Sequence, residues 1–220
     1  MAAFENTLKK YPSKLDPNVI LKVYEGHFAT VHSHITKYFD FSTIKARRSE
    51  AMAAANILAD KYVNTTIVDT ILCMEGTEVI GAYLADKLTR NGIMSMNAHK
   101  TIYVVSPELG TGGQIVFRDN NEFMIKGKNV LLLVASASTG GTIFQSAECI
   151  EYYGGTIAGI SAIFSATPKV GKHDINSIFT ADDVPGYGSY KMKDCPYCQN
   201  KQKLDAIVNA YGDRKSTRLN

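Results

Sequence analysis

Apolar and polar positions along this 220-residue chain alternate in blocks that predict strands and helices in turn. The clearest strand lies near 129–135, where residues 130–134 are all valine or leucine, as expected for a strand buried on both faces of a parallel sheet. Similar runs predict strands near 67–73, 101–105 and 157–163, and helical periodicity predicts helices over 47–62, over 79–90 and after Thr142. This order predicts an α/β fold, a mostly parallel sheet flanked by helices on both faces.

The remaining segments give weaker patterns. They predict a helical lead over 1–26 broken at Pro12 and Pro17, an antiparallel strand pair over 27–41, a hairpin over 114–125, an edge strand over 175–180 and a closing helix over 203–211. Residues 213–220 have no apolar face, so we expect a disordered or extraneous tail after a single domain of residues 1–212.

Composition narrows the function classes. Hydrophobic residues make up 45% and charged residues 20%, which are ordinary globular values. A net charge of +3 without a basic cluster argues against nucleic acid, and no apolar run reaches membrane-spanning length. Four cysteines at this length do not form a disulfide framework, so we expect a cytoplasmic protein.

A candidate anion site follows the strand near 129–135. Small residues lead into Ser138, Thr139, Gly140, Gly141 and Thr142, and an amphipathic segment follows. A helix that begins after such a loop presents unpaired N–H groups and the positive end of its dipole, and the hydroxyls add donors. We therefore predict phosphate binding at 138–142, although the same pattern could also be a tight turn.

Histidines and cysteines also suggest a metal site. His27, His32 and His34 fall in the predicted strand pair, and Cys195 and Cys198 have a spacing that supplies half of a zinc site. No carboxylate or cysteine stands at a spacing from the histidines that would help to complete a metal site. We therefore expect exposed strand histidines and reduced structural thiols, and assign no metal ligand.

The segment KNVLLLVASASTGGT resembles the phosphoribosyl pyrophosphate (PRPP) motif of type I phosphoribosyltransferases. Two further segments resemble the orotate branch of that family: Phe28, Tyr38 and Asp40 match its amino-terminal hood, and the Val-Pro, Tyr and Asp-Cys-Pro-x-Cys sequence of 184–198 matches its carboxyl-terminal part. The resemblance implies a small hood formed by residues of about 1–45 and 180–200, a homodimer, and Mg²⁺ as cofactor.

The resemblance also implies roles for individual residues. Glu75, Gly76 and Thr77 would form the turn that receives pyrophosphate, although a plain strand-to-helix turn is an equal alternative. Gly110, Thr111 and Gly112 would belong to a lid. The ligands would be PRPP or a nucleoside monophosphate, with a nucleobase such as orotate, in pyrimidine nucleotide synthesis.

The sequence departs from the family at two places. The acid pair that holds the ribose hydroxyls falls on Val134 and Ala135, and the lid cations fall on Val105 to Leu109, with no basic residue before Arg118. Two hypotheses remain: a phosphoribosyltransferase, or a protein that has lost the chemistry and binds a nucleotide or PRPP as a sensor or partner subunit. No catalytic residue is assigned. A dinucleotide oxidoreductase is disfavoured because no Gly-x-Gly-x-x-Gly follows the first strand.

Overall fold

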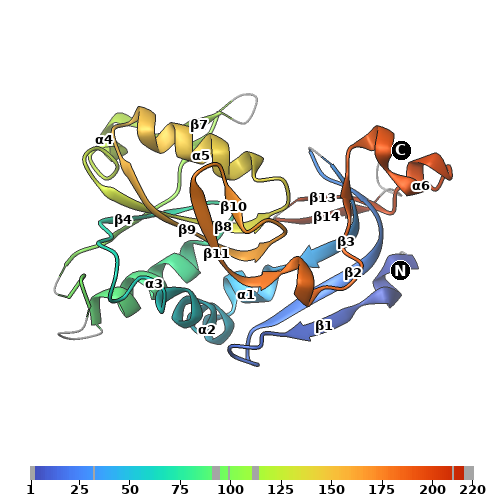
Figure 1. Ribbon diagram of the computed structural model, residues 1–220, viewed down its shortest axis with the longest axis horizontal. Helices are drawn as coiled ribbons and strands as arrows, with labels where there is room; N and C mark the ends of the chain where they lie inside the picture. The colour runs from blue at the N-terminus through green and yellow to red at the C-terminus, as the bar shows by residue number, and fades with distance from the viewer. Residues whose placement is uncertain are drawn as a thin grey trace.

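The computed structural model describes residues 3–31, 33–90, 95–98, 100–110, 114–209 and 211–215. One of its two six-stranded sheets has the strand order β10-β11-β9-β8-β4-β5, in which the strands from β11 to β5 are parallel and β10 is antiparallel (Figure 1). The strands are β4 (Thr70–Cys73), β5 (Tyr103–Val105), β8 (Asn129–Ala137), β9 (Thr156–Ser165), β10 (Lys169–Val170) and β11 (His173–Thr180). The predicted parallel α/β sheet is therefore confirmed.

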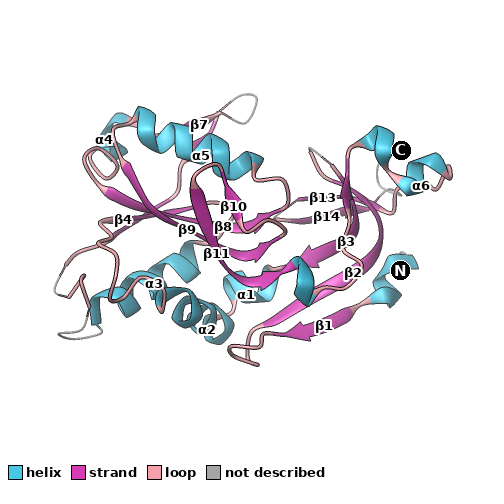
Figure 2. Cartoon of the chain, in the orientation of Figure 1, coloured by secondary structure: helices cyan, strands magenta, loops and turns pink. Residues whose placement is uncertain are grey.

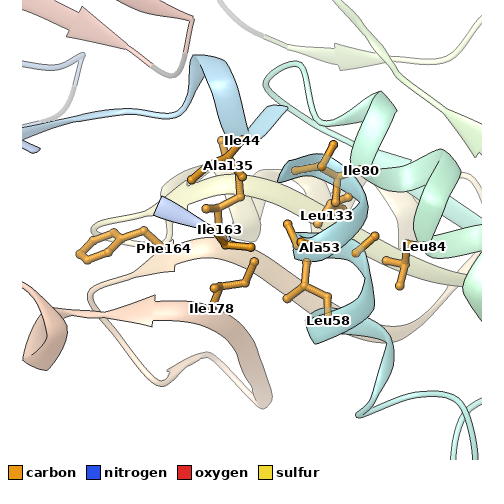
Figure 3. Close-up of a cluster of buried hydrophobic side chains, with 14 of the residues drawn as sticks. Ile44, Ala53, Leu58, Ile80, Leu84, Leu133, Ala135, Ile163, Phe164 and Ile178 are labelled. Atoms are coloured by element: carbon orange, nitrogen blue, oxygen red, sulfur yellow. The ribbon is translucent and has the colours of Figure 1, made fainter. Parts of the chain in front are cut away.

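The central strand β8 is buried on both faces, as its apolar run predicts. Leu131, Leu133 and Ala135 contribute to the core beneath α2 (Arg48–Ala59) and α3 (Glu78–Arg90), part of which is drawn in Figure 3. The alternate residues of β8 belong to the core on the opposite face, beneath α5 (Gly141–Tyr152). Helices thus cover both faces of the sheet.

A second sheet forms the hood beside this layered unit (Figure 2). Its strands are β1 (Lys9–Pro12), β2 (Ile20–Ala29), β3 (His34–Asp40), β12 (Ser189–Tyr190), β13 (Ala206–Asn209) and β14 (Gly212–Lys215), and α1 (Ser42–Ala46) leads from β3 to α2. The antiparallel pairing of β2 with β3 confirms the strand pair expected over 27–41. β13 pairs in parallel with β2, so the end of the chain returns to its beginning.

Both terminal helices predicted from the sequence are wrong. In β2 the buried Leu21 and Val23 alternate with less buried neighbours, and in β13 the buried Ala206 and Val208 alternate with exposed residues. This period of two is that of a strand with one face on the core. Residues 213–215, expected to be tail, pair with β13 as part of β14, and 216–220 lie outside the described residues.

Two further segments differ from expectation. Instead of a hairpin over 114–125, β7 (Ile115–Val116) pairs with β6 (Glu108–Leu109), and α4 (Asp119–Glu122) follows. β11 is not the edge strand, because β10 pairs along its outer side. The short elements are 3₁₀ turns at Ala3–Thr7, Ala181–Asp183 and Met192–Asp194, and α6 (Pro196–Gln199). Among the described helices, none combines the length and apolar character needed to cross a bilayer.

Candidate functional site

The candidate site lies at the carboxyl ends of β4 and β8, two neighbouring parallel strands. The chain leaves β4 through α3 towards β5, whereas it leaves β8 through α5 towards β9 on the other side of the sheet. Ligands of open parallel sheets bind at such a point, where the direction of winding reverses. A cavity of about 190 Å³ opens here, between the loop after β8 and the hood.

The loop after β8 has the geometry expected of an anion site. Gly140 has a φ of 80°, and α5 begins at the next residue with no side-chain cap from the described residues. Its first N–H groups therefore have no partner within the helix. The hydroxyls of Ser138, Thr139 and Thr142 line the cavity, and no other described residue hydrogen-bonds them. The loop thus brings together the donors that the sequence predicted, and phosphate binding itself stays a prediction.

The hood supplies an apolar wall opposite this loop. The residues of this wall include Val31, Ile35, Tyr38, Phe39 and Phe41. Of the three hood residues in the orotate pattern, Tyr38 lines the cavity, Phe28 is fully buried behind it, and Asp40 accepts hydrogen bonds from Ser42. An aromatic wall facing the predicted phosphate loop fits a ligand with a flat ring at one end and a phosphate at the other.

The turn after β4 places a carboxylate at the end of β8. Glu75 has a φ of 61° and Gly76 a φ of 79°, and two successive left-handed residues turn the Glu75 side chain back across the sheet edge. One carboxylate oxygen, Oε2, accepts the N–H of Ala135 at 3.0 Å and that of Ser136 at 3.2 Å. A non-glycine residue in this conformation is strained, which is characteristic of functional sites.

Burial raises the pKa of Glu75, and the two backbone N–H groups and the nearby Lys45 oppose this rise. Sequence reasoning placed Glu75 on the pyrophosphate turn, but missed its contact with β8. The two strands lie about 60 positions apart in sequence, so only the sheet order reveals the contact.

Lys45 is a buried cation at the same turn, which the sequence analysis missed. Its side chain comes from α1 in the hood, donates to the carbonyl oxygen of Glu75 at 2.8 Å, and lies over the Tyr211 ring at 5.3 Å from the centroid. Burial lowers the pKa of Lys45, and Glu75 and Glu78 partly offset this. A lysine between Ile44 and Ala46 in a short helix gives almost no sequence signal of such a position.

The other two residues of the predicted turn shape it. The buried Thr77 hydroxyl donates to the carbonyl oxygens of Met74 at 2.9 Å and Leu133 at 3.2 Å, so it ties the turn to β8. Gly76 lies beneath Lys45 and Tyr211, since a Cβ there would be 3.5 Å from each. Of the three turn residues, Glu75 lines the cavity.

A second cavity of about 360 Å³ continues the first towards the predicted lid. The two share the lining residues Val31, Glu75, Thr142 and Asn209, so they form one cleft. Glu78 and Ser106 line the second cavity, with Ser106 Oγ donating to Glu78 at 2.6 Å. The cleft therefore holds the predicted phosphate loop at one end and two carboxylates further along.

The lid region contributes little positive charge. Gly110 follows β6 at the surface, whereas Thr111 and Gly112 lie outside the described residues. Arg118 makes a two-pronged ion pair with Glu108, with contacts of 2.6–3.0 Å, and this carboxylate raises the pKa of Arg118. The first basic residue after the lid is therefore held by a neighbouring acid.

The sequence predicted that the histidines are exposed on a strand and far from any cysteine. This prediction is wrong for His27 and His34. His27 is buried, and its side chain meets His34, Cys195 and Cys198 in one cluster. His32 lies outside the described residues. The sequence concealed this cluster because its two halves are separated by about 160 residues.

The raised pKa of Glu75 predicts a specific dependence of stability on pH. The folded protein holds the proton of the Glu75 carboxyl group more tightly than the unfolded chain does. Protonation of Glu75 therefore stabilises the fold fully below pH 4.5, and this stabilisation is lost as pH rises through the pKa of the folded protein. Glu75→Gln should remove this loss. We expect urea unfolding between about pH 4 and 8 to show a smaller decline in the free energy of unfolding for the variant. Parallel curves for the two proteins would contradict the assignment.

Comparisons with known proteins agree with this geometry. No protein-family model matches the chain. The chain is 26% identical over 147 residues to an orotate phosphoribosyltransferase of Pelotomaculum thermopropionicum. The aligned residues cover 60% of this chain and 73% of the relative.

Solved structures show the same fold. A UMP synthase of Leishmania donovani matches with a TM-score of 0.55 and 15% identity over 74% of this chain, which spans only 34% of that longer protein. The orotate phosphoribosyltransferase of Aeropyrum pernix matches with a TM-score of 0.50 and 18% identity, over 73% of this chain and 88% of that one.

Proposed function

This chain has the fold of the type I phosphoribosyltransferases and resembles their orotate branch in sequence, and we propose that it binds PRPP or a nucleoside 5′-monophosphate. The 5′-phosphate would sit on residues 138–142. The observation that carries the proposal is the loop itself. The first N–H groups of α5, which have no partner within the helix, and three hydroxyls that no other described residue hydrogen-bonds converge at the point where the sheet winding reverses.

The remainder of the ligand would extend along the cleft. The aromatic wall around Tyr38 and Phe39 suits a flat base, and the Glu75 turn would lie beside the ribose and its pyrophosphate. Lys45 adds a buried positive charge at this turn. The reaction proposed from these contacts is transfer of ribose 5-phosphate to orotate or a related base, as in pyrimidine nucleotide synthesis. The expected homodimer and cytoplasmic location stay predictions.

The donor set of the cleft fits Mg²⁺. Magnesium ions in phosphate-binding sites are held by one or two carboxylates together with ligand phosphates. Glu75 and Glu78 line the same cavity, beyond the phosphate loop. These two side chains would hold the ion, which when bound neutralises charge on a departing pyrophosphate.

Other residues of the chain would take the remaining roles in the transfer of ribose 5-phosphate. The phosphate loop would fix the 5′ end, and the hood wall would exclude water from the anomeric carbon as an oxocarbenium-like state develops. Breaking the bond to pyrophosphate leaves positive charge on the ribose, and the Glu75 carboxylate is the acid placed at the end of β8. Lys45, which donates to the Glu75 carbonyl oxygen at this turn, would add positive charge near the leaving group.

A binding protein without turnover is the second candidate. Val134 and Ala135 are fully buried in the two cores, so the positions of the family's acid pair offer no ribose ligand. Arg118, the nearest cation after the lid, is held by Glu108. These two observations favour binding over efficient catalysis.

Ligand titration separates the two candidates. We expect PRPP and orotidine monophosphate to bind, PRPP more tightly with Mg²⁺, and pyrophosphate release with orotate to be slower than about 1 s⁻¹, the lower end of ordinary enzyme rates. Thr139→Val should lower the affinity for both ligands about tenfold or more, since a hydrogen bond to a charged group contributes about 1.5–3 kcal/mol.

Thr65→Val is the matched control. This exposed threonine precedes β4, at the opposite edge of the sheet, so its loss should leave affinity unchanged. The binding proposal is refuted if neither ligand binds with Mg²⁺ present. Turnover within the ordinary range of about 1–10³ s⁻¹ would instead establish an efficient transferase.

A further inference from the structure

Four potential metal ligands converge at the far end of the hood. The side-chain nitrogens of His27 and His34 and the sulfurs of Cys195 and Cys198 all lie within 4.8 Å of one another. Nε2 of His27 is 3.0 Å from Nδ1 of His34, 3.5 Å from Sγ of Cys195 and 3.6 Å from Sγ of Cys198. Sγ of Cys198 is 3.2 Å from Nδ1 of His34.

These separations match a tetrahedral zinc ion. With Zn–N bonds of about 2.0–2.1 Å and Zn–S bonds of about 2.3 Å, neighbouring ligand atoms lie about 3.3–3.8 Å apart. The four separations given above fall within a few tenths of an ångström of this range, and the remaining two, which join Cys195 to His34 and to Cys198, are within 4.8 Å. Two thiolates and two imidazoles form a donor set that selects zinc over magnesium or calcium.

Backbone geometry turns His27 towards the cysteines. The pairing of β2 with β3 shifts register between Glu25 and Phe28, which is a bulge that redirects the side chain between them. Asp205 satisfies the backbone groups exposed by the bulge, because its carboxylate accepts the His27 N–H and its own N–H donates to the His27 carbonyl oxygen. Irregular backbone is thus held in a fixed shape at the cluster.

The protonation of His27 also fits metal ligation. Nδ1 lies 3.0 Å from the carbonyl oxygen of Gln202 and 3.3 Å from that of Lys203. Carbonyl oxygens only accept, so Nδ1 carries the proton and Nε2 directs a lone pair at the cluster. A second hydrogen bond of this kind is characteristic of histidines that bind zinc.

Hydrogen bonding alone accounts poorly for the cluster. Thiols are weak donors, and without an ion they and His34 would share a single strong acceptor, Nε2 of His27. A divalent cation uses all four lone pairs at once. The Cys-Pro-Tyr-Cys sequence at the start of α6 supplies both sulfurs from a single turn, with the Gln199 N–H donating to the Cys195 carbonyl oxygen.

From this geometry we propose a structural zinc site formed by His27, His34, Cys195 and Cys198. Four protein ligands fill a tetrahedral shell and leave no position for a substrate, so the ion holds structure and takes no part in chemistry. It fastens the segment around α6 to β2 and β3. The chain then continues through Asp205 into β13, whose Val208 and Asn209 line the cleft.

Metal analysis of the whole chain, prepared without a metal-binding tag, tests the site. We expect about one zinc ion per chain. The variants Cys198→Ser and His34→Ala should lose it, whereas Cys149→Ser, which changes a cysteine on α5 outside the cluster, should keep it. Zinc retained by both cluster variants, or lost equally from Cys149→Ser, would overturn the assignment.

Cobalt exchange gives a readout that does not depend on the folding of variants. Replacement of zinc by Co²⁺ in the unmodified protein should produce thiolate-to-cobalt charge transfer and the absorption of a tetrahedral ion. A strong chelator should lower the melting temperature, and added Zn²⁺ should restore it. Protein that contains no metal and binds neither Zn²⁺ nor Co²⁺ would refute the proposal, as would an intact Cys195–Cys198 disulfide found by mass spectrometry in the freshly isolated protein.

Discussion

Gly140→Val is expected to lower the affinity for any 5′-phosphorylated ligand by at least about a hundredfold, or about 2.7 kcal/mol. Gly140 has a φ of 80°, and a Cβ built there lies 2.4 Å from Cγ2 of Val170. The left-handed conformation alone costs a β-branched residue on the order of 1–3 kcal/mol. The loop must therefore move away from β10, which takes the N–H groups of α5 out of the cavity. Isothermal titration with PRPP measures the loss.

Gly171→Val is the control for backbone strain. Gly171 follows Val170, has a φ of 56°, and has no atom within 4 Å of an added Cβ. Its substitution should lower the melting temperature without a comparable loss of affinity. Gly140→Ala combined with Val170→Ala should recover part of the binding, because the second change removes the methyl group that clashes. Equal affinities for the two valine variants would show that the loop is only a turn.

The central sheet could be predicted because its signals are local. The apolar run of β8 requires burial on both faces, and the structure places alternate residues of that run in two different cores. The conformation of the loop at 138–142 follows the same logic, since small residues between a buried strand and a helix fix it within about ten positions of sequence.

The hood could not be predicted in the same way. β13 becomes a strand by pairing with β2, about 180 positions earlier, and its short alternating run also fits part of a helix. A long separation in sequence also hides the contacts between the candidate functional side chains. Glu75 reaches β8 through sheet order, Lys45 reaches Glu75 through the fold of α1 against the sheet, and the histidines and cysteines meet through the return of the chain to the hood.

Positions 134 and 135, where the family has its acid pair, are buried in this protein. Substituting acids there therefore cannot simply restore a ribose-binding site. Ala135 is fully buried, among apolar side chains that include Ile44 and Ile163 (Figure 3). Its N–H already donates to the Glu75 carboxylate. An aspartate here would lose its hydration and lie beside another acid, so returning the family's residues at 134 and 135 adds buried charge rather than a ribose ligand.

Ala135→Asp should therefore lower the free energy of unfolding by about 3–5 kcal/mol, the usual cost of an uncompensated buried charge. Ser138→Asp is the matched control, because Ser138 is half-buried and lines the cavity. Its aspartate stays hydrated, so stability should change by less than about 1 kcal/mol while phosphate binding is lost through charge repulsion. Urea unfolding and PRPP titration of both variants measure the two effects separately. An Ala135→Asp protein that is as stable as the parent and binds PRPP more tightly would show that residue 135 faces the cleft rather than the core.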